Sequence, residues 1–83
     1  MINVNYKRLG EKIKKERLAN SLTQAKLAEK VEISPTFLGQ IERGERVPSL
    51  ETVVNIAITL NITIDGLLCE SELSDGQLFR SYL

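Results

Sequence analysis

The spacing of apolar and polar residues along the chain predicts a series of short helices. In the first, Tyr6, Leu9 and Ile13 recur at the spacing of one helical face, and the side chain of Asn5 can cap the first turn. Asn20 is a poor helix former, so we place the end of this helix there. The first segment is therefore an amphipathic helix with one face directed into a core.

Two more short helices follow, separated by a few residues. Thr23 can accept a hydrogen bond from the first turn of a helix that runs to about Val31. Ser34 repeats this capping chemistry, and Pro35 takes the first helical position, where its missing N–H costs nothing. Gly44 supplies a left-handed stop to the second helix. The inward residues are Leu27, Ala28 and Val31 in one helix and Leu38 and Ile41 in the other.

The second of these helices has a polar outer face. We expect Thr36, Gly39, Gln40 and Arg43 to lie off its apolar stripe and to face outward. A short helix with such a face, presented on the outside of a compact domain, has the shape that a DNA major groove accepts. The pattern therefore predicts a helix-turn-helix unit and makes double-stranded DNA the expected partner.

Three helices are predicted after this unit. Ser49 caps the first of them and Asn61 ends it, Thr63 caps one of one to two turns, and Ser74 with Gln77 forms the capping box of a last helix. Their apolar positions are Leu50, Val53, Val54, Ala57 and Ile58, then Ile64, Leu67 and Leu68, then Leu73 and Leu78. The chain is thus expected to be all-α, a compact bundle of five short helices over residues 1–69 with a C-terminal helical extension over residues 70–83.

Composition narrows the class of protein. A chain of 83 residues, 42% of them hydrophobic, can bury one modest core. No apolar run approaches membrane-helix length and the first residues lack a signal-peptide core, so we expect a cytoplasmic protein with no membrane partner. There is no histidine, no glycine-rich phosphate loop and no activated nucleophile, and Cys69 is the single cysteine. We therefore expect no catalytic residue, metal, cofactor or small-molecule ligand.

The zero net charge conceals an asymmetry. Residues 1–46 carry ten Lys or Arg against six Asp or Glu, a net of +4, whereas residues 47–83 carry one basic residue against five acidic ones, a net of −4. The basic half contains the two-helix unit, and phosphate contacts from a basic patch supply most non-specific DNA affinity. Ordinary solvation is the alternative for Lys12, Lys14 and Lys15.

From about Leu9 to Leu68 the chain resembles the phage repressor and Cro type of helix-turn-helix protein, the XRE family, whose fold is lambda-repressor-like. The resemblance is carried by Arg17, Leu22-Thr23-Gln24, Leu27-Ala28, Ser34-Pro35, Ile41-Glu42-Arg43-Gly44 and Pro48-Ser49-Leu50-Glu51-Thr52 in this order and spacing. Two positions depart from the usual pattern. Ser21 and Glu32 stand where glycine is common, so we expect these two turns to be strained or differently shaped.

The resemblance implies a role for individual residues. Pro35, Thr36 and Gln40 match base-facing positions, where Gln40 can pair with adenine and the Thr36 methyl can pack on a thymine methyl. The implied phosphate contacts are Lys14, Gln24, Ser34, Arg43 and Arg46, with surface solvation as the alternative for Arg46. The Gln24 amide is also expected to brace the recognition helix, with simple hydrogen bonding at the start of its own helix as the alternative. Arg17 and Glu42 correspond to an ion pair between the first helix and the end of the recognition helix. Phe37 supports the core or lies along the DNA backbone.

The apolar residues after the motif exceed what a small core covers, which predicts an interface between two copies of the chain. We assign to it Ile62, Ile64, Leu78, Phe79 and Tyr82, while the alternative is that the last helix folds back on its own domain. The expected function is that of a sequence-specific DNA-binding transcriptional regulator, a repressor that binds a palindromic operator as a homodimer. An antitoxin or adaptor-type protein-interaction module with the same fold is the alternative.

Overall fold

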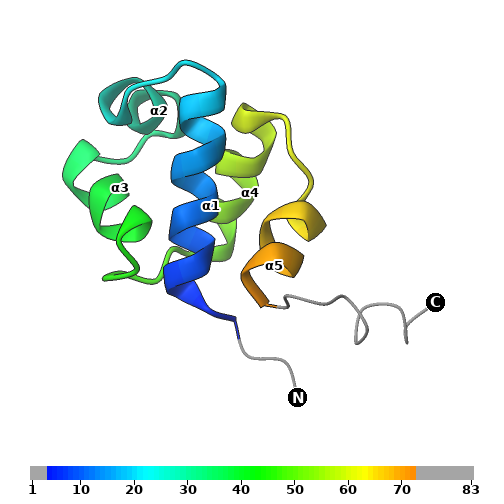
Figure 1. Ribbon diagram of the computed structural model, residues 1–83. Helices are drawn as coiled ribbons and strands as arrows, with labels where there is room; N and C mark the ends of the chain where they lie inside the picture. The colour runs from blue at the N-terminus through cyan, green and yellow to red at the C-terminus, as the bar shows by residue number, and fades with distance from the viewer. Residues whose placement is uncertain (1–3, 73–83) are drawn as a thin grey trace.

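The computed structural model describes residues 4–72, which form five helices and no strand (Figure 1). The helices are α1 (Tyr6–Ala19), α2 (Gln24–Val31), α3 (Pro35–Glu42), α4 (Leu50–Leu60) and α5 (Ile64–Glu72). All five were predicted over this range, and α5 continues beyond the one to two turns expected of it. The last predicted helix, from Ser74 to Leu83, lies outside the described residues.

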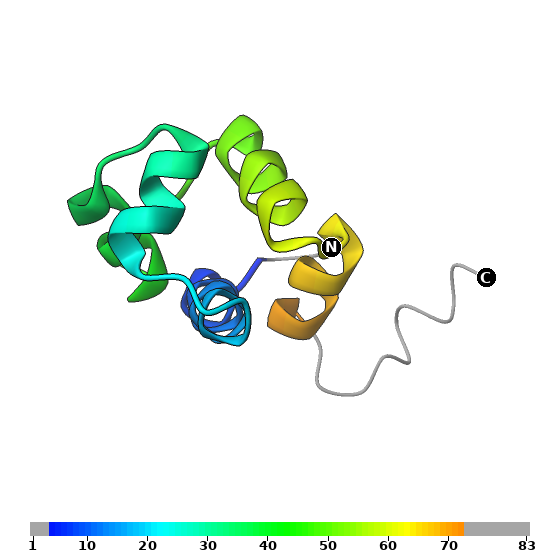
Figure 2. The ribbon, with the colours of Figure 1, turned by 90° about the horizontal axis from the view of Figure 1, so that it is seen from above.

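Helix α1 is the central element of the bundle. It packs most extensively against α5 and α3, which lie on opposite sides of it, and α2 contacts both α3 and α4. Seen from above, the helices are arranged around a common core, with α4 opposite α1 (Figure 2). This arrangement places α2 and α3 together on one side of the molecule and leaves the outer side of α3 uncovered by the other helices.

Each helix begins at the polar residue that the sequence predicts. In every case the side-chain oxygen of the cap accepts a hydrogen bond from the backbone N–H three residues later, at 2.8–3.1 Å. Such caps satisfy N–H groups that have no partner inside the helix. The capping residues are Asn5, Thr23, Ser34, Ser49 and Thr63.

Four of the helices also end in the same way. Each is followed by a residue in the left-handed conformation, namely Ser21, Glu32, Gly44 or Asn61, with φ of 58°, 61°, 76° and 59° respectively. The next residue donates its N–H to the carbonyl five residues earlier, which is the Schellman arrangement. Gly44 and Asn61 were predicted as such stops. The positive φ of Ser21 and Glu32 agrees with the strain expected where glycine is usual.

Twelve buried apolar side chains from all five helices make the core. They are Leu9 and Ile13 of α1, Leu27, Ala28 and Val31 of α2, Leu38 and Ile41 of α3, Val53, Ile56, Ala57 and Leu60 of α4, and Leu67 of α5. Ile62 and Ile64, which we assigned to a dimer interface, are partly buried and pack against this core. The other three residues of that assignment, Leu78, Phe79 and Tyr82, lie outside the described range.

Two predicted core faces were wrong in detail. Tyr6 is exposed rather than inward. The buried face of α1 is formed by Leu9 and Ile13, which lie about one and two turns further along the helix. In α4 the predicted members Leu50 and Ile58 are 76% and 71% exposed, while Ile56, which the stripe did not include, is fully buried. Helix α4 is apolar on most of its circumference, so periodicity alone does not indicate which side meets the core.

The crossing of α1 and α3 depends on a glycine that the sequence analysis did not single out. Gly10 is buried, and a Cβ atom there would collide with the carbonyl oxygen of Ile41 and lie 2.6 Å from that of Glu42. Backbone atoms cannot swing aside as the end of a flexible side chain can. Gly10 therefore allows α1 to approach the last turn of α3 directly.

We predict that Gly10→Ala lowers the free energy of unfolding by about 1–3 kcal/mol, because overpacking against two carbonyl groups outweighs the better helix propensity of alanine. Gly39→Ala is the matched control, since a Cβ there would meet only the ends of the Arg43 and Gln24 side chains. It should be neutral or stabilise by up to about 1 kcal/mol. Urea denaturation measures both, and a Gly10→Ala protein as stable as the parent would refute the proposed close contact.

Candidate nucleic-acid interface

Helix α3 is held at the surface by the chemistry of its two ends. Ser34 caps it, Pro35 occupies its first position, and the left-handed Gly44 stops it. Its inward residues Leu38 and Ile41 are fully buried, as expected. The helix is therefore anchored along one side.

The outer side of α3 carries the residues that the resemblance assigns to base contacts. Pro35 and Thr36 are exposed and Gln40 is half-buried. Gly39, which we expected to face outward, is buried instead, because the side chains of Gln24 and Arg43 lie over it. The small residue thus leaves room for two long polar side chains against the helix backbone.

Glu42, the last residue of α3, accepts hydrogen bonds from the Arg17 side chain of α1. Arg17 Nε donates to Glu42 Oε2 at 2.7 Å, and its Nη2 donates to Glu42 Oε1 at 3.1 Å. Both side chains are nearly inaccessible, at 7% and 2% exposure. Arg17 Nη1 donates in addition to the carbonyl of Leu22, at 2.8 Å. One guanidinium group therefore ties α1 to the end of α3 and to the turn before α2.

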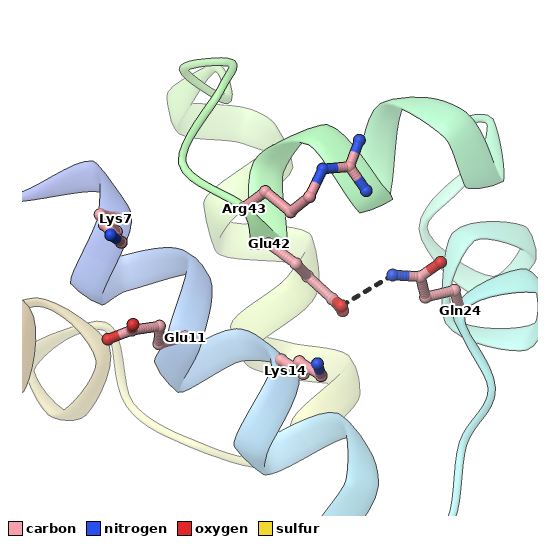
Figure 3. A pocket seen from close by; sticks show the side chains of 6 residues that line it. All are labelled: Lys7, Glu11, Lys14, Gln24, Glu42 and Arg43. Atoms are coloured by element: carbon pink, nitrogen blue, oxygen red, sulfur yellow. Dashed lines mark hydrogen bonds between the residues drawn. The ribbon is translucent and has the colours of Figure 1, made fainter.

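Gln24 completes this network from α2. Its amide nitrogen donates to Glu42 Oε1 at 2.9 Å (Figure 3). The Glu42 carboxylate therefore receives donors from α1 and α2, and both of its oxygens are used. Gln24 braces the recognition helix, which is one of the two roles that the resemblance implies for it.

Two shallow hollows adjoin the outer side of α3. The first, of about 370 Å³, is lined by Lys7, Glu11, Lys14, Gln24, Glu42 and Arg43 (Figure 3). The second, of about 300 Å³, is lined by Gln24, Pro35, Thr36, Gly39 and Arg43. Gln24 and Arg43 border both. The structure thus gathers two base-contact candidates, Pro35 and Thr36, with three phosphate-contact candidates, Lys14, Gln24 and Arg43.

Sequence reasoning missed one cation of this surface. Lys7 lines the first hollow together with Lys14, from which it is separated by seven residues along α1. Residues seven apart lie on the same side of a helix, so this spacing could have indicated a common face. Gln40, Ser34 and Arg46 line neither hollow.

Arg43 and Glu45 form an exposed ion pair beside the two hollows. Arg43 Nε donates to Glu45 Oε2 at 3.0 Å and Nη2 donates to Oε1 at 3.2 Å. The hydrogen bond from Arg43 lowers the pKa of Glu45 below its ordinary value, and the same bond raises the pKa of Arg43. The side chains are 59% and 54% exposed, so solvent reaches both charges.

Arg46 is exposed, and its guanidinium group lies over the ring of Phe37. Its guanidinium carbon is 5.5 Å from the centroid of the Phe37 ring, within the range of a cation–π contact. Phe37 itself is partly buried and packs against the core. The ring thus supports the core, as one of its two expected roles requires, and also positions a cation next to the end of α3.

Other kinds of site find little support in the part of the chain that the structure describes. Among the side chains that the structure describes, no cluster of three or more from His, Cys, Asp or Glu could hold a metal ion. Within residues 4–72 no helix combines the length and the apolar character needed to cross a membrane.

The family model described as helix-turn-helix matches residues 13–67 of the chain. This chain belongs to the XRE family of helix-turn-helix proteins. The matched segment runs from the middle of α1 into α5, and so contains the α2–α3 unit and the Arg17–Glu42 pair. The family is one of DNA-binding regulators and not of enzymes.

Relatives of known type agree with this assignment. The control protein C.SmaI of Serratia marcescens is 35% identical over 69 residues, which cover 83% of this chain and 82% of that protein. The immunity repressor of Bacillus phage phi105 is 38% identical over 65 residues, which cover 78% of this chain. The chain spans 45% of the length of that repressor.

A solved structure agrees as well. The P22 c2 repressor in complex with synthetic operator 9T matches with a TM-score of 0.69 and 32% identity, over 72% of this chain and 91% of that one.

We predict that Glu42→Gln lowers the free energy of unfolding by about 3–5 kcal/mol, because it leaves the buried charge of Arg17 without an anionic partner. Glu29→Gln is the matched control. It breaks an exposed pair with Lys26, with an N–O distance of 3.4 Å, and should change stability by less than about 1 kcal/mol. Chemical denaturation followed by circular dichroism distinguishes the two, and similar small losses would show that the buried pair does not hold the bundle together.

Proposed function

We propose that this protein is a sequence-specific DNA-binding transcriptional repressor that acts as a homodimer. The observation that carries the proposal is the juxtaposition of the polar outer side of α3 with hollows bordered by Lys7, Lys14 and Arg43. Groups that can read base edges and groups that can bind phosphate therefore share one surface, as recognition of a duplex requires. The repressors named above, one of them solved on an operator, support the same function.

In this proposal α3 enters the major groove and reads a few base pairs. Gln40 offers an amide that can donate to and accept from adenine, and the exposed Thr36 can place its methyl group on thymine. The neighbouring Pro35 adds apolar contact. The network at Glu42 supports the proposal, because a helix braced from two sides keeps these side chains in register.

The residues that we expect to bind DNA phosphates surround this face of α3. We assign phosphate contacts to Lys14, Gln24, Ser34, Arg43 and Arg46, and we add Lys7 because it borders the same hollow as Lys14. Each phosphate that such a cation neutralises releases counterions from the duplex, so affinity should fall steeply as salt rises.

A single helix of eight residues contacts too few base pairs for a specific site, so we propose that two copies bind a palindromic operator. Family geometry would place the half-site centres about 34 Å apart, one turn of the duplex. The outer side of α4 supports a second copy as partner. Leu50 and Ile58 are the most exposed large apolar side chains among the described residues, and Val54 lies between them on the same side.

Selection of bound sequences from a random duplex pool tests the proposed function directly. Recovery of a two-fold symmetric motif with half-sites one helical turn apart is the expected result. A pool that gains no motif, from a protein that is folded by circular dichroism, would overturn the proposal and favour the antitoxin or adaptor role.

We predict that Gln40→Ala weakens binding to the selected operator by about 1–3 kcal/mol while leaving binding to random-sequence DNA nearly unchanged. The reason is that a base contact is made only on the correct sequence. Thr36→Ala should act in the same direction but more weakly, since it removes at most a hydroxyl and a methyl contact. Fluorescence anisotropy with both duplexes measures the effect, and an equal loss on the two DNAs would exclude Gln40 from base readout.

We further predict that Ile58→Asp converts the dimer to a monomer, because a charge on the apolar side of α4 would have to be buried between copies. Leu18→Asp is the control, since it places the same charge on an exposed apolar residue of α1 instead of α4. Sedimentation at micromolar concentration reports the oligomeric state. A parent protein that sediments as a monomer would rule out the dimer, and an Ile58→Asp dimer would place the interface elsewhere.

A further inference from the structure

The end of α3 differs from the other three left-handed helix ends in one residue. After α1, α2 and α4 the residue that follows the left-handed position is apolar and packs against the core. These residues are Leu22, Ile33 and Ile62. After α3 the corresponding residue is Glu45, although its backbone N–H makes the same bond, to the carbonyl of Gln40 at 2.8 Å. Apolar packing against the core therefore does not account for a glutamate at this position.

The side chain of Glu45 is instead engaged with Arg43. The left-handed Gly44 turns the chain back on itself. The carboxylate of Glu45 therefore lies next to the guanidinium group of Arg43, which is two residues earlier. The carboxylate occupies the edge formed by Nε and Nη2, with one oxygen on each nitrogen. This edge presents the paired donors with which arginine binds a phosphate.

Arg43 is also the cation best placed to contact DNA. It borders both hollows and lies beside the reading face of α3, whereas Lys7 and Lys14 border only the first hollow. Both members of the Arg43–Glu45 pair are more than half exposed, so a phosphate oxygen can approach the guanidinium group from solvent. Glu45 therefore already holds two of the five N–H donors with which Arg43 could bind a phosphate.

We propose that Glu45 is an intramolecular competitor for DNA phosphate at Arg43, and that it sets how strongly this end of α3 binds the duplex backbone. This inference rests on the proposed function. While the pair is intact, its two charges largely cancel, and a phosphate that binds the Nε/Nη2 edge of Arg43 must displace the carboxylate of Glu45. The competition therefore lowers affinity for any duplex, whatever its sequence.

The test measures binding of the 83-residue chain to a fluorescein-labelled duplex of random sequence over a series of potassium chloride concentrations. Glu45→Gln should tighten binding by about two- to fivefold, the range expected when an exposed ion pair no longer competes. It should also steepen the slope of log K against log salt by up to roughly one unit. Arg43→Ala should weaken binding and reduce that slope by roughly one unit.

Two controls separate competition from a general effect of charge. Glu29→Gln changes the net charge equally and also breaks an exposed pair, but one on α2, and should change affinity less. In the Arg43→Ala background, Glu45→Gln should increase DNA affinity much less than it does when Arg43 is present, because the cation for which Glu45 competes is absent. An equal gain in both backgrounds, or equal effects of Glu45→Gln and Glu29→Gln, would overturn the inference while leaving DNA binding intact. Failure of all variants to bind DNA would overturn the proposed function and the inference with it.

Discussion

The buried carboxylate of Glu42 is the contact on which the placement of α3 depends. It receives donors from Arg17 of α1 and Gln24 of α2, and it lies in the turn of α3 that Gly10 allows α1 to approach. A buried ion pair adds little net stability compared with apolar packing, because both charges lose their water. Its consequence is geometric. The donors come from two other helices, so α3 can shift relative to α1 or α2 only by breaking hydrogen bonds, and those from Arg17 are buried.

That constraint brings charges from distant parts of the sequence onto one surface. Lys7 and Lys14 lie on α1, Gln24 begins α2, and Arg43 follows α3, yet all four line the same hollow. The lining of this hollow combines three cations with the carboxylates of Glu11 and Glu42, so it is net positive beside α3. A field focused in this way attracts a polyanion more strongly than the zero net charge of the chain suggests.

Helix boundaries could be predicted from the sequence because the interactions that set them are local. Caps such as Ser49 and stops such as Asn61 act within a few residues of themselves. Three features depended instead on contacts between helices. The buried side of α4 could not be chosen, since Ile58 is as apolar as Ile56, and the buried positions of Gly10 and Gly39 follow from side chains and carbonyl groups of other elements. The same distinction holds for the candidate site. Its residues could be predicted from their match to the family pattern, whereas the proximity of Lys7 and Arg43 depends on how the helices pack.

Adjacent residues at the end of α3 show how burial decides what an ion pair can do. Glu42 points inward to Arg17, and Arg43 points outward to Glu45, because successive residues of a helix face different sides. An exposed ion pair contributes about 0–1 kcal/mol to stability, and a contact with a phosphate can compensate for its loss. Breaking a buried pair costs about 3–5 kcal/mol. If Arg43 binds a phosphate, as we propose, a duplex takes Arg43 from Glu45 but leaves Arg17 with Glu42, and the surface of this turn rearranges while the buried contact stays in place.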